Sequence, residues 1–396
     1  MKQSFVILII IIGAQFCCTS LWFAGNAVMP NLIDTYALEE NVLGHITAAV
    51  QIGFIIGTLF FAVFTIVDRY SPSKVFFTCA LLGALFNLGA LWDKSSLTSL
   101  FIFRLTTGFF LAGIYPVGMK IATDHFDKSL SKSLGLLVGA LVLGTAFPHL
   151  LTLSTLSFPW QWVFLTTSIL AAIGGAFMRL AVPDGPYRMP ISKIELSAFF
   201  RLFKRPQFRS AAFGYFGHMW ELYAFWTFIP ILFKTYMNWH PSTTFNIPFW
   251  SFSIIGIGAL ASSYSGVLSV QLGAQRTAFT ALLLSCICCL ISPLLFYTPY
   301  KELFLGVLLF WGMMVIADSP VFSTLIANSV PSTTKGTALT IVNCIGFSIT
   351  IISIQLLSFL NAYFTDTRCI YMILAIGPLL GLFSLLLSKK KIRVPK

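Results

Sequence analysis

Two side chains that can carry a proton lie inside the apolar stretch YFGHMWELYAFW, residues 215–226. His218 and Glu221 are three residues apart, and this spacing places them on the same face of a helix. Burial disfavours the charged form of either group, so a buried carboxyl can alternate between its protonated and charged forms near neutral pH. The pair is therefore a candidate site for taking up and releasing a proton.

The composition shows why charges in such a stretch are unusual. The chain has 396 residues, of which 57% are hydrophobic and only 10% are charged, whereas a soluble chain usually carries about 25% charged residues. Apolar stretches of about 20 residues, each long enough to cross a hydrocarbon core about 30 Å thick, recur from end to end. These features predict an all-α membrane protein that crosses the bilayer many times.

Breaks at Pro, Gly and charged residues divide the chain into twelve predicted transmembrane helices. The first apolar stretch is too long for a signal peptide and has no clear cleavage site, so we interpret it as an uncleaved helix. The longest polar link joins the sixth and seventh helices. The predicted helices are 5–27, 44–66, 74–92, 98–122, 133–154, 160–181, 210–234, 248–272, 277–297, 302–328, 336–360 and 369–388.

The distribution of Lys and Arg predicts the topology, because cytoplasmic loops carry an excess of these residues. With the N-terminus in the cytoplasm, 20 of the 25 Lys and Arg residues fall on the cytoplasmic side and one, Arg104, lies within a span. The other side carries four, Lys94, Lys234, Lys301 and Arg368. We therefore expect both termini and the middle loop to be cytoplasmic, and the net charge of +12 to reflect topology and not nucleic-acid binding.

Several classes of chemistry have no motif in the chain. The eight cysteines fall mostly within predicted spans, and their spacing matches neither a metal site nor a disulfide framework. There is no phosphate-binding loop and no segment large and polar enough for a nucleotide-binding domain. The sequence thus predicts neither an enzyme nor a primary pump, and no metal or cofactor.

The two halves of the chain resemble each other weakly. SLWFAGNAVMP, ending at Pro30, and WELYAFWTFIP, ending at Pro230, occupy matching places in the first and seventh spans. The offset is about half the chain, as in transporters built from two parallel repeats. DRYSPSK follows the second span, and RLTTGFFLAGIYP, with Arg104 and Gly108, lies in the fourth.

These features resemble the major facilitator superfamily over the whole chain. DRYSPSK is similar to the signature loop of that family but lacks its leading Gly, and the Gly-Pro pair typical of drug/proton antiporters is absent from GLLVGALVLGTAFPH. GHMWELYAFW and IADSPVFSTLIA resemble a bacterial subgroup with no assigned substrate. The resemblance implies twelve helices in two six-helix bundles related by a pseudo-twofold axis, with predicted boundaries 1–182, 183–209 (a cytoplasmic linker) and 210–396.

The resemblance also implies a central cavity lined by the first, fourth, seventh and tenth helices. Arg104, Glu221 and Asp318 are the charged residues at membrane depth, and all three lie on these helices. Such residues cost at least about 2.5–3.5 kcal/mol at the bilayer centre, so they persist where they face water, a partner or a substrate. We expect Glu221, Asp318 and His218 to carry the coupling proton, unless Glu221 pairs permanently with Arg104 or Asp318 makes only a structural hydrogen bond.

Arg104 keeps its proton, so it suits an anionic substrate group or control of a nearby acid; the alternative is an ion-pair strut. Pro320 is expected to bend the tenth helix beside Asp318. Asp68, Arg69 and Lys74 are expected to form a cytoplasmic gating latch. Gln51 and His149, on flanking helices, are weaker candidates for the cavity wall. The predicted wall residues are Asn26, Tyr115, Tyr223, Trp226, Ser319 and Ser323.

The leading hypothesis is a proton-coupled transporter of the bacterial inner membrane. It would take up a small anionic or zwitterionic solute by symport and alternating access, as a monomer surrounded by lipid, without nucleic acid. Arg104 and the absent antiporter motif favour uptake. The alternatives are proton-antiport efflux of a metabolite, siderophore or drug, and a receptor-like membrane protein that transports nothing.

Overall fold

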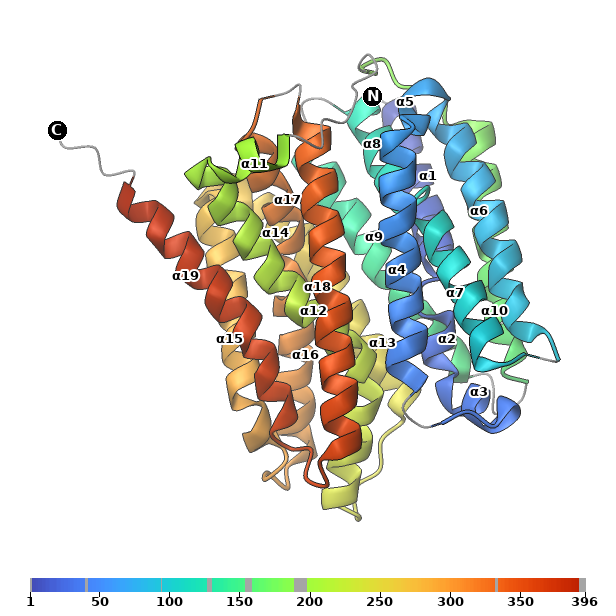
Figure 1. The fold of residues 1–396 in the computed structure, drawn as a ribbon, viewed down its shortest axis with the longest axis vertical. Coiled ribbons are helices and arrows are strands. Elements are labelled where there is room, and N and C mark those ends of the chain that lie inside the picture. Colours follow the sequence, from blue (N-terminus) through green and yellow to red (C-terminus); the bar gives the residue numbers. More distant parts are fainter. Residues whose placement is uncertain are drawn as a thin grey trace. The chain divides into compact units, whose positions relative to one another are not determined.

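The computed structural model describes residues 2–39, 42–93, 95–126, 130–153, 159–188, 198–331 and 334–391, and the regular secondary structure in these ranges is entirely helical. The predicted all-α fold is therefore confirmed. The chain forms two compact units (Figure 1). Unit 1 comprises Met1–Lys193 and Asn246–Ala259, and unit 2 comprises Ile194–Phe245 and Leu260–Lys396.

Unit 1 is built on the predicted first six spans, several of which are divided. The first span leaves the helix after Thr19 and resumes at Ala24, and the fourth is divided between Leu111 and Tyr115. The helices are α1 Lys2–Thr19, α2 Ala24–Ala27, α3 Met29–Tyr36, α4 Val42–Val63, α5 Ile66–Arg69, α6 Pro72–Leu88, η1 Gly89–Leu91, α7 Leu97–Leu111, α8 Tyr115–His125, α9 Leu130–Leu151, α10 Gln161–Ala181 and α13 Ile247–Gly256.

Glycines bring α4 and α7 close together in unit 1. A Cβ on Gly53 of α4 would overlap the backbone carbonyl of Leu105, and one on Gly108 of α7 would overlap that of Val50. Small residues at such positions let two helix backbones approach in a membrane, where van der Waals packing drives association. The predicted Arg104–Gly108 motif thus has a structural reason: Gly108 fixes the height and rotation of the helix that carries Arg104.

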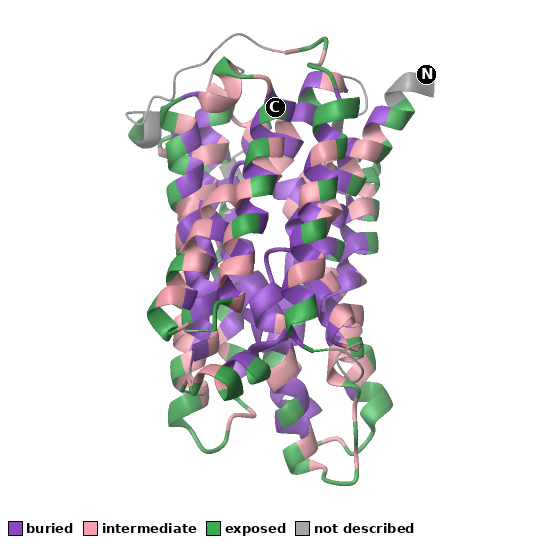
Figure 2. Ribbon diagram, turned by 90° about the vertical axis from the view of Figure 1, so that its right-hand side faces the viewer, coloured by how far each residue is buried: buried purple, intermediate pink, exposed green. Residues whose placement is uncertain are grey.

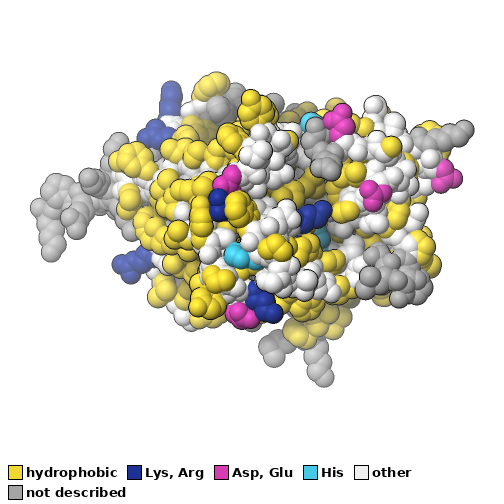
Figure 3. All heavy atoms as spheres, turned by 90° about the horizontal axis from the view of Figure 1, so that it is seen from below, with side chains coloured by type: hydrophobic (Ala, Val, Ile, Leu, Met, Phe, Trp, Pro, Cys, Tyr) yellow, Lys and Arg dark blue, Asp and Glu magenta, His cyan; other side chains and the backbone are white. Residues whose placement is uncertain are grey.

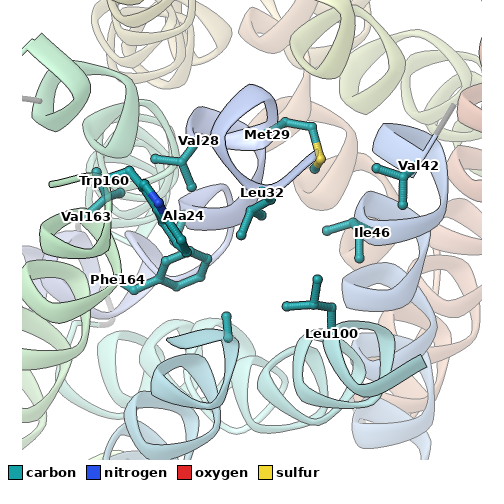
Figure 4. Packing of buried hydrophobic residues seen from close by; sticks show 11 residues of the cluster. Ala24, Val28, Met29, Leu32, Val42, Ile46, Leu100, Trp160, Val163 and Phe164 are labelled. Carbon is teal, nitrogen blue, oxygen red and sulfur yellow. The ribbon is translucent and has the colours of Figure 1, made fainter. Parts of the chain in front are cut away.

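A buried apolar cluster anchors the short helices α2 and α3 (Figure 4). Its side chains come from α2, α3, α4, α7, α10 and η1 or from residues directly beside these helices, so this cluster holds the chain that follows the break in the first span. The eleven buried members are Ala24, Val28, Met29, Leu32, Val42, Ile46, Ala90, Leu100, Trp160, Val163 and Phe164.

Unit 2 is centred on one long helix, α12, which packs against α18 and α19. Gly217 of α12 meets Gly377 at the start of α19, and a side chain on either glycine would overlap the opposing helix. Pro230 lies inside α12 without ending it. The helices of this unit are α11 Ala198–Phe203, α12 Pro206–Trp239, α14 Gly258–Leu272, α15 Ala274–Leu295, α16 Lys301–Ala317, α17 Ser319–Asn328, α18 Lys335–Tyr363, η4 Ile370–Ala375 and α19 Ile376–Lys391.

The outer helix faces are apolar and exposed. On α10, Ile169, Ile173, Phe177 and Leu180 recur at helical spacing, and Leu180 is 85% exposed. Figure 2 shows that such helices alternate buried and exposed sides along their length. An exposed apolar stripe of this kind suits a lipid environment and would be exceptional in a soluble monomer.

Ten helices within the described ranges are long and apolar enough to cross a membrane. The first predicted span contributes only the shorter apolar helix Phe5–Thr19, and the seventh, α12, is long but less apolar. The count of twelve therefore stays a prediction. Figure 3 shows one end of the molecule, where Lys and Arg side chains occur singly among hydrophobic ones.

The predicted boundaries 1–182, 183–209 and 210–396 also stay a prediction. The two compact units differ from them in two respects. The predicted linker is divided between the units after Lys193, and residues 246–259 group with unit 1, where α13 packs against α9. Residues 189–197 of the predicted linker lie outside the described residues.

Candidate functional site

Glu221 of α12 is almost completely buried, with 1% of its surface exposed. Its Oε1 accepts a hydrogen bond from Trp311 Nε1 of α16 at 2.5 Å and another from Ser285 Oγ of α15. Phe225, one turn along α12, stacks on Trp311 with ring centroids 4.3 Å apart and fixes the indole. Both donors are neutral, so neither balances the charge of Glu221 when it is ionised.

His218, one turn before Glu221 on α12, lies beside Asp318, the residue between α16 and α17. Its Nδ1 is 2.7 Å from Asp318 Oδ1, and both side chains are as buried as that of Glu221. Nε2 of His218 and Oδ2 of Asp318 have no hydrogen-bond partner among the described residues. The structure thus brings together two of the three predicted proton-site residues and leaves each with one unused polar atom.

Asp318 marks the break between α16 and α17, as the sequence predicted from Pro320. Pro320 occupies the second position of α17, where its missing N–H removes no helical hydrogen bond. Two predicted wall residues follow the break: Ser319 is half-buried, and Ser323 Oγ donates to Ser319 O at 3.2 Å. The hydroxyl of Ser323 is therefore used inside its own helix.

Arg104 of α7 supports the break in the first span. Its Nη2 donates to the backbone carbonyls of Leu21 and Trp22 at 2.9 and 2.6 Å, and its Nη1 donates to Asn87 Oδ1 at 2.7 Å. Asn87 in turn donates to Ser168 Oγ at 3.0 Å. The guanidinium therefore satisfies carbonyls that the interrupted helix leaves open, and no acid among the described residues forms an ion pair with it.

The other predicted wall residues lie in both units. Asn26 of α2 donates from Nδ2 to Thr47 Oγ1 of α4 at 2.7 Å, and Tyr115 is a half-buried residue at the start of α8. In unit 2, Tyr223 and Trp226 are buried on α12 with ring centroids 5.5 Å apart. Their contact with a substrate stays a prediction.

The predicted gating residues have separate roles in unit 1. Asp68 forms an ion pair with Lys120 of α8 at 3.2 Å, and Arg69 Nε donates to Thr65 Oγ1 at 3.0 Å within its own turn. Arg188 donates to the carbonyls of Asp68 and Tyr70 at 2.9 and 2.7 Å. Lys74 is exposed and lines a cavity of about 450 Å³ with Arg179 and Asp184, among others.

Sequence reasoning missed the neutral partners that hold these groups. Asn87, Ser285 and Trp311 lie in apolar spans and carry no motif, so nothing in their spacing singled them out. Lys120 and Arg188 were counted only as cytoplasmic charges. A search for polar side chains inside predicted spans would have found Asn87 and Ser285.

The fold and the buried charges define a class: a helical membrane protein that crosses the bilayer several times and keeps ionisable groups inside its helix bundles. Groups of His, Cys, Asp and Glu that could hold a metal ion are absent from the described part of the chain. The sequence model of the Major Facilitator Superfamily matches residues 11–354, so the chain belongs to this family of membrane transporters. The comparison with curated proteins found no match to the chain.

Proposed function

We propose that the protein is a proton-coupled secondary transporter that takes up a small anionic or zwitterionic solute by symport. The observation that carries this proposal is the environment of Glu221, which is buried in unit 2 and held by two neutral donors. An ionised carboxylate there has no countercharge among the described residues, whereas a protonated one costs far less to bury. The charge state of Glu221 therefore depends strongly on which surroundings alternating access presents to it.

His218 and Asp318 form the second proton site of this proposal. With one proton shared between Nδ1 and Oδ1 the pair has no net charge, and without that proton it carries the negative charge of the carboxylate. The unused Nε2 and Oδ2 are available to exchange a proton with the surroundings. Asp318 also lies at a helix break, where a change in backbone geometry moves the carboxyl relative to His218. Movement at the break and transfer of the proton are thus linked.

The substrate class rests on Arg104. Its two terminal nitrogens bind neutral acceptors, so its positive charge is not cancelled by an acid in the described ranges. Nε has no hydrogen-bond partner there. An anionic group that reached Nε would meet an uncompensated charge, which favours an anionic or zwitterionic solute.

We further propose that the protein lies in the bacterial inner membrane as a monomer with both termini in the cytoplasm. The support is the uneven count of Lys and Arg, 20 on one side against four on the other. The exposed apolar stripes on helices such as α10 would contact lipid.

The test uses purified protein in liposomes that contain a pH-sensitive dye. Amino acids and organic acids are added outside, and an active solute is expected to carry protons inward with it. In Glu221→Gln, solute-driven proton entry should fall by on the order of 100-fold, as when a proton-transfer group is removed. Glu302→Gln, an exposed Glu on α16, is the matched control and should transport normally.

The direction of proton movement separates the alternatives. Proton exit on solute entry would indicate antiport, and the absence of flux for every solute would indicate a receptor-like protein. If Glu221→Gln and Asp318→Asn both left proton-coupled flux unchanged, the assignment of the proton sites would be wrong.

A further inference from the structure

Unit 1 contains a group of buried polar side chains that the proton sites do not use. They are Asn26 of α2, Gln51 of α4 and His149 of α9, with 6%, 0% and 3% of their surfaces exposed. Asn26 belongs to residues 20–26, the segment that contains the break in the first span, and Gln51 and His149 lie on helices that pack against this segment. Their positions around this segment and their unused polar atoms together suggest what they bind.

Gln51 faces this segment from α4. Thr47, one turn before Gln51, accepts the hydrogen bond from Asn26, and Phe54, about one turn after it, packs on Trp22 with ring centroids 5.0 Å apart. Residues three and four apart share one face of a helix. Gln51 therefore lies between two residues that both contact the segment.

His149 faces the same segment from α9. Its ring lies 6.4 Å from the ring of Phe23, and α2 packs against both α4 and α9. Residues 20–26 are thus flanked by Gln51 on one side and by His149 on the other, while Arg104 binds the carbonyls of Leu21 and Trp22.

The polar atoms that remain are complementary to an uncharged group. Gln51 Oε1 and Nε2, Asn26 Oδ1 and His149 Nε2 have no hydrogen-bond partner among the described residues. Each such atom costs about 1–3 kcal/mol when it stays buried and unpaired. Together they offer both donors and acceptors but no carboxylate, so they fit a group that both donates and accepts hydrogen bonds.

We infer that Gln51, Asn26 and His149 form a subsite for a hydroxyl or amide group of the transported solute. This inference rests on the proposed function and adds to it: the solute carries a neutral hydrogen-bonding group beside its charge. A site built to bind a hydroxyl or an amide rejects an analogue that lacks it, because its own polar groups are then left unpaired.

Gln15 of α1 provides a matched control in the same unit. Its amide is also fully buried and has no partner in the described ranges, but it lies against Gly118 of α8 and near Phe76 of α6. Gln15→Leu and Gln51→Leu therefore make the same chemical change at equal burial. The proposal expects only Gln51→Leu to alter solute recognition.

The experiment measures thermal unfolding of the purified full-length protein with solutes in matched pairs. Gluconate and hexanoate differ only in hydroxyl groups, and asparagine and 2-aminobutyrate differ only in the amide; sorbitol has hydroxyls and no charge. We expect a hydroxyl- or amide-bearing member to raise Tm while its partner does not. Gln51→Leu should weaken the binding of the hydroxyl- or amide-bearing solute by at least about tenfold, because about one hydrogen bond is lost. Gln15→Leu should leave this binding unchanged.

Three results would overturn the inference: equal stabilisation by both members of every pair, retention of the shift in Gln51→Leu, or no stabilisation by any of these solutes. The readout needs no proton gradient, so it separates the two proposals. Pair-selective binding without proton-driven flux would leave the subsite standing and remove the proposed function. Proton-driven flux with equal KM in Gln51→Leu and Gln15→Leu would support the proposed function and remove the subsite.

Discussion

The two units bury charge in different ways. Unit 1 buries Arg104, which keeps its charge, and surrounds it with neutral acceptors from the first and third spans. Unit 2 buries Glu221, His218 and Asp318, which can gain or lose a proton, and gives them few partners. A fixed charge stabilises one arrangement of the chain, whereas a titratable charge makes the arrangement depend on protons.

The helices that carry these charges are built alike. The fourth span divides into α7 and α8 and the tenth into α16 and α17, and in both the second helix begins with Pro at its second position. Arg104 lies two turns before its break, while Asp318 lies at the break itself. Similar backbones thus carry a permanent charge in one half and a carboxyl group in the other, so under the proposed function binding and coupling would be divided between the halves.

The first and seventh spans differ more. Both contain a proline at matching places, yet the first is broken at residues 20–23 and α12 continues through Pro230 to Trp239. Arg104 supplies the donors that satisfy the open carbonyls of the first span. Such a break is tolerated in a membrane only where the freed backbone groups find partners.

The largest expected effect follows from removing Arg104. Arg104→Leu leaves two buried carbonyls and Asn87 Oδ1 without their donor, and this should lower the free energy of unfolding by at least about 3 kcal/mol. Thermal unfolding in detergent measures it. Arg179→Leu, the same change on an exposed residue of α10, should unfold close to the wild type.

Arg104→Lys sharpens this prediction. Lysine keeps the charge but cannot form the planar set of hydrogen bonds that reaches three acceptors. If the main role of Arg104 is to hold the broken first span, Arg104→Lys should be little more stable than Arg104→Leu. Full restoration of both stability and transport by Lys would show that only the positive charge matters.

The second effect concerns the proton acceptor at the helix break. Asp318→Asn keeps the size of the side chain and removes its charge, so we expect proton-coupled uptake to fall by on the order of 100-fold while solute exchange without a gradient continues. Dye-loaded liposomes measure the first and labelled solute the second. Thr324→Ala on α17 is the control, because its hydroxyl donates to the Pro320 carbonyl within its own helix.

A loss of exchange together with uptake would contradict this view of Asp318. It would mean that Asp318 contributes to binding or folding and not to coupling alone. His218→Gln provides an independent check, since it retains a hydrogen-bonding side chain but cannot take up a proton at physiological pH.

The sequence predicted the helical membrane fold and a bend in the tenth helix beside Asp318. Apolar length, Lys and Arg counts and Pro320 carry these signals locally. The partners could not be predicted, because Trp311 reaches Glu221 across 90 positions and Asn87 reaches Ser168 across 81. Such pairings depend on helix rotation and packing, which the local sequence does not specify. The break at residues 20–23 was missed for the same reason, since its support, Arg104, lies on another helix.

The smallest effect is expected outside the membrane in unit 2. Arg368 lies over the rings of Trp239 and Tyr297, 3.6 and 4.5 Å from their centroids, and its hydrogen bonds hold the pKa of Asp366 at about 2. Because this pKa is depressed from 3.8, the contribution of the pair is present above pH 3.8 and is lost only as the pH falls through about 2. Asp366 therefore stays ionised between about pH 5 and 8. A group that carries the coupling proton would gain or lose its charge within that range, so Asp366 is not expected to contribute to the pH dependence of uptake.

Asp366→Asn should accordingly change uptake by less than about twofold, because exposed ion pairs contribute little. The shape of its pH profile between about pH 5 and 8 should match the wild type, whereas Glu221→Gln should flatten it. Initial uptake rates at a series of pH values compare the three proteins. If the pH profile of uptake were shifted in Asp366→Asn, surface charge would set the pH dependence. The difference between the buried groups of the two units would then not explain coupling.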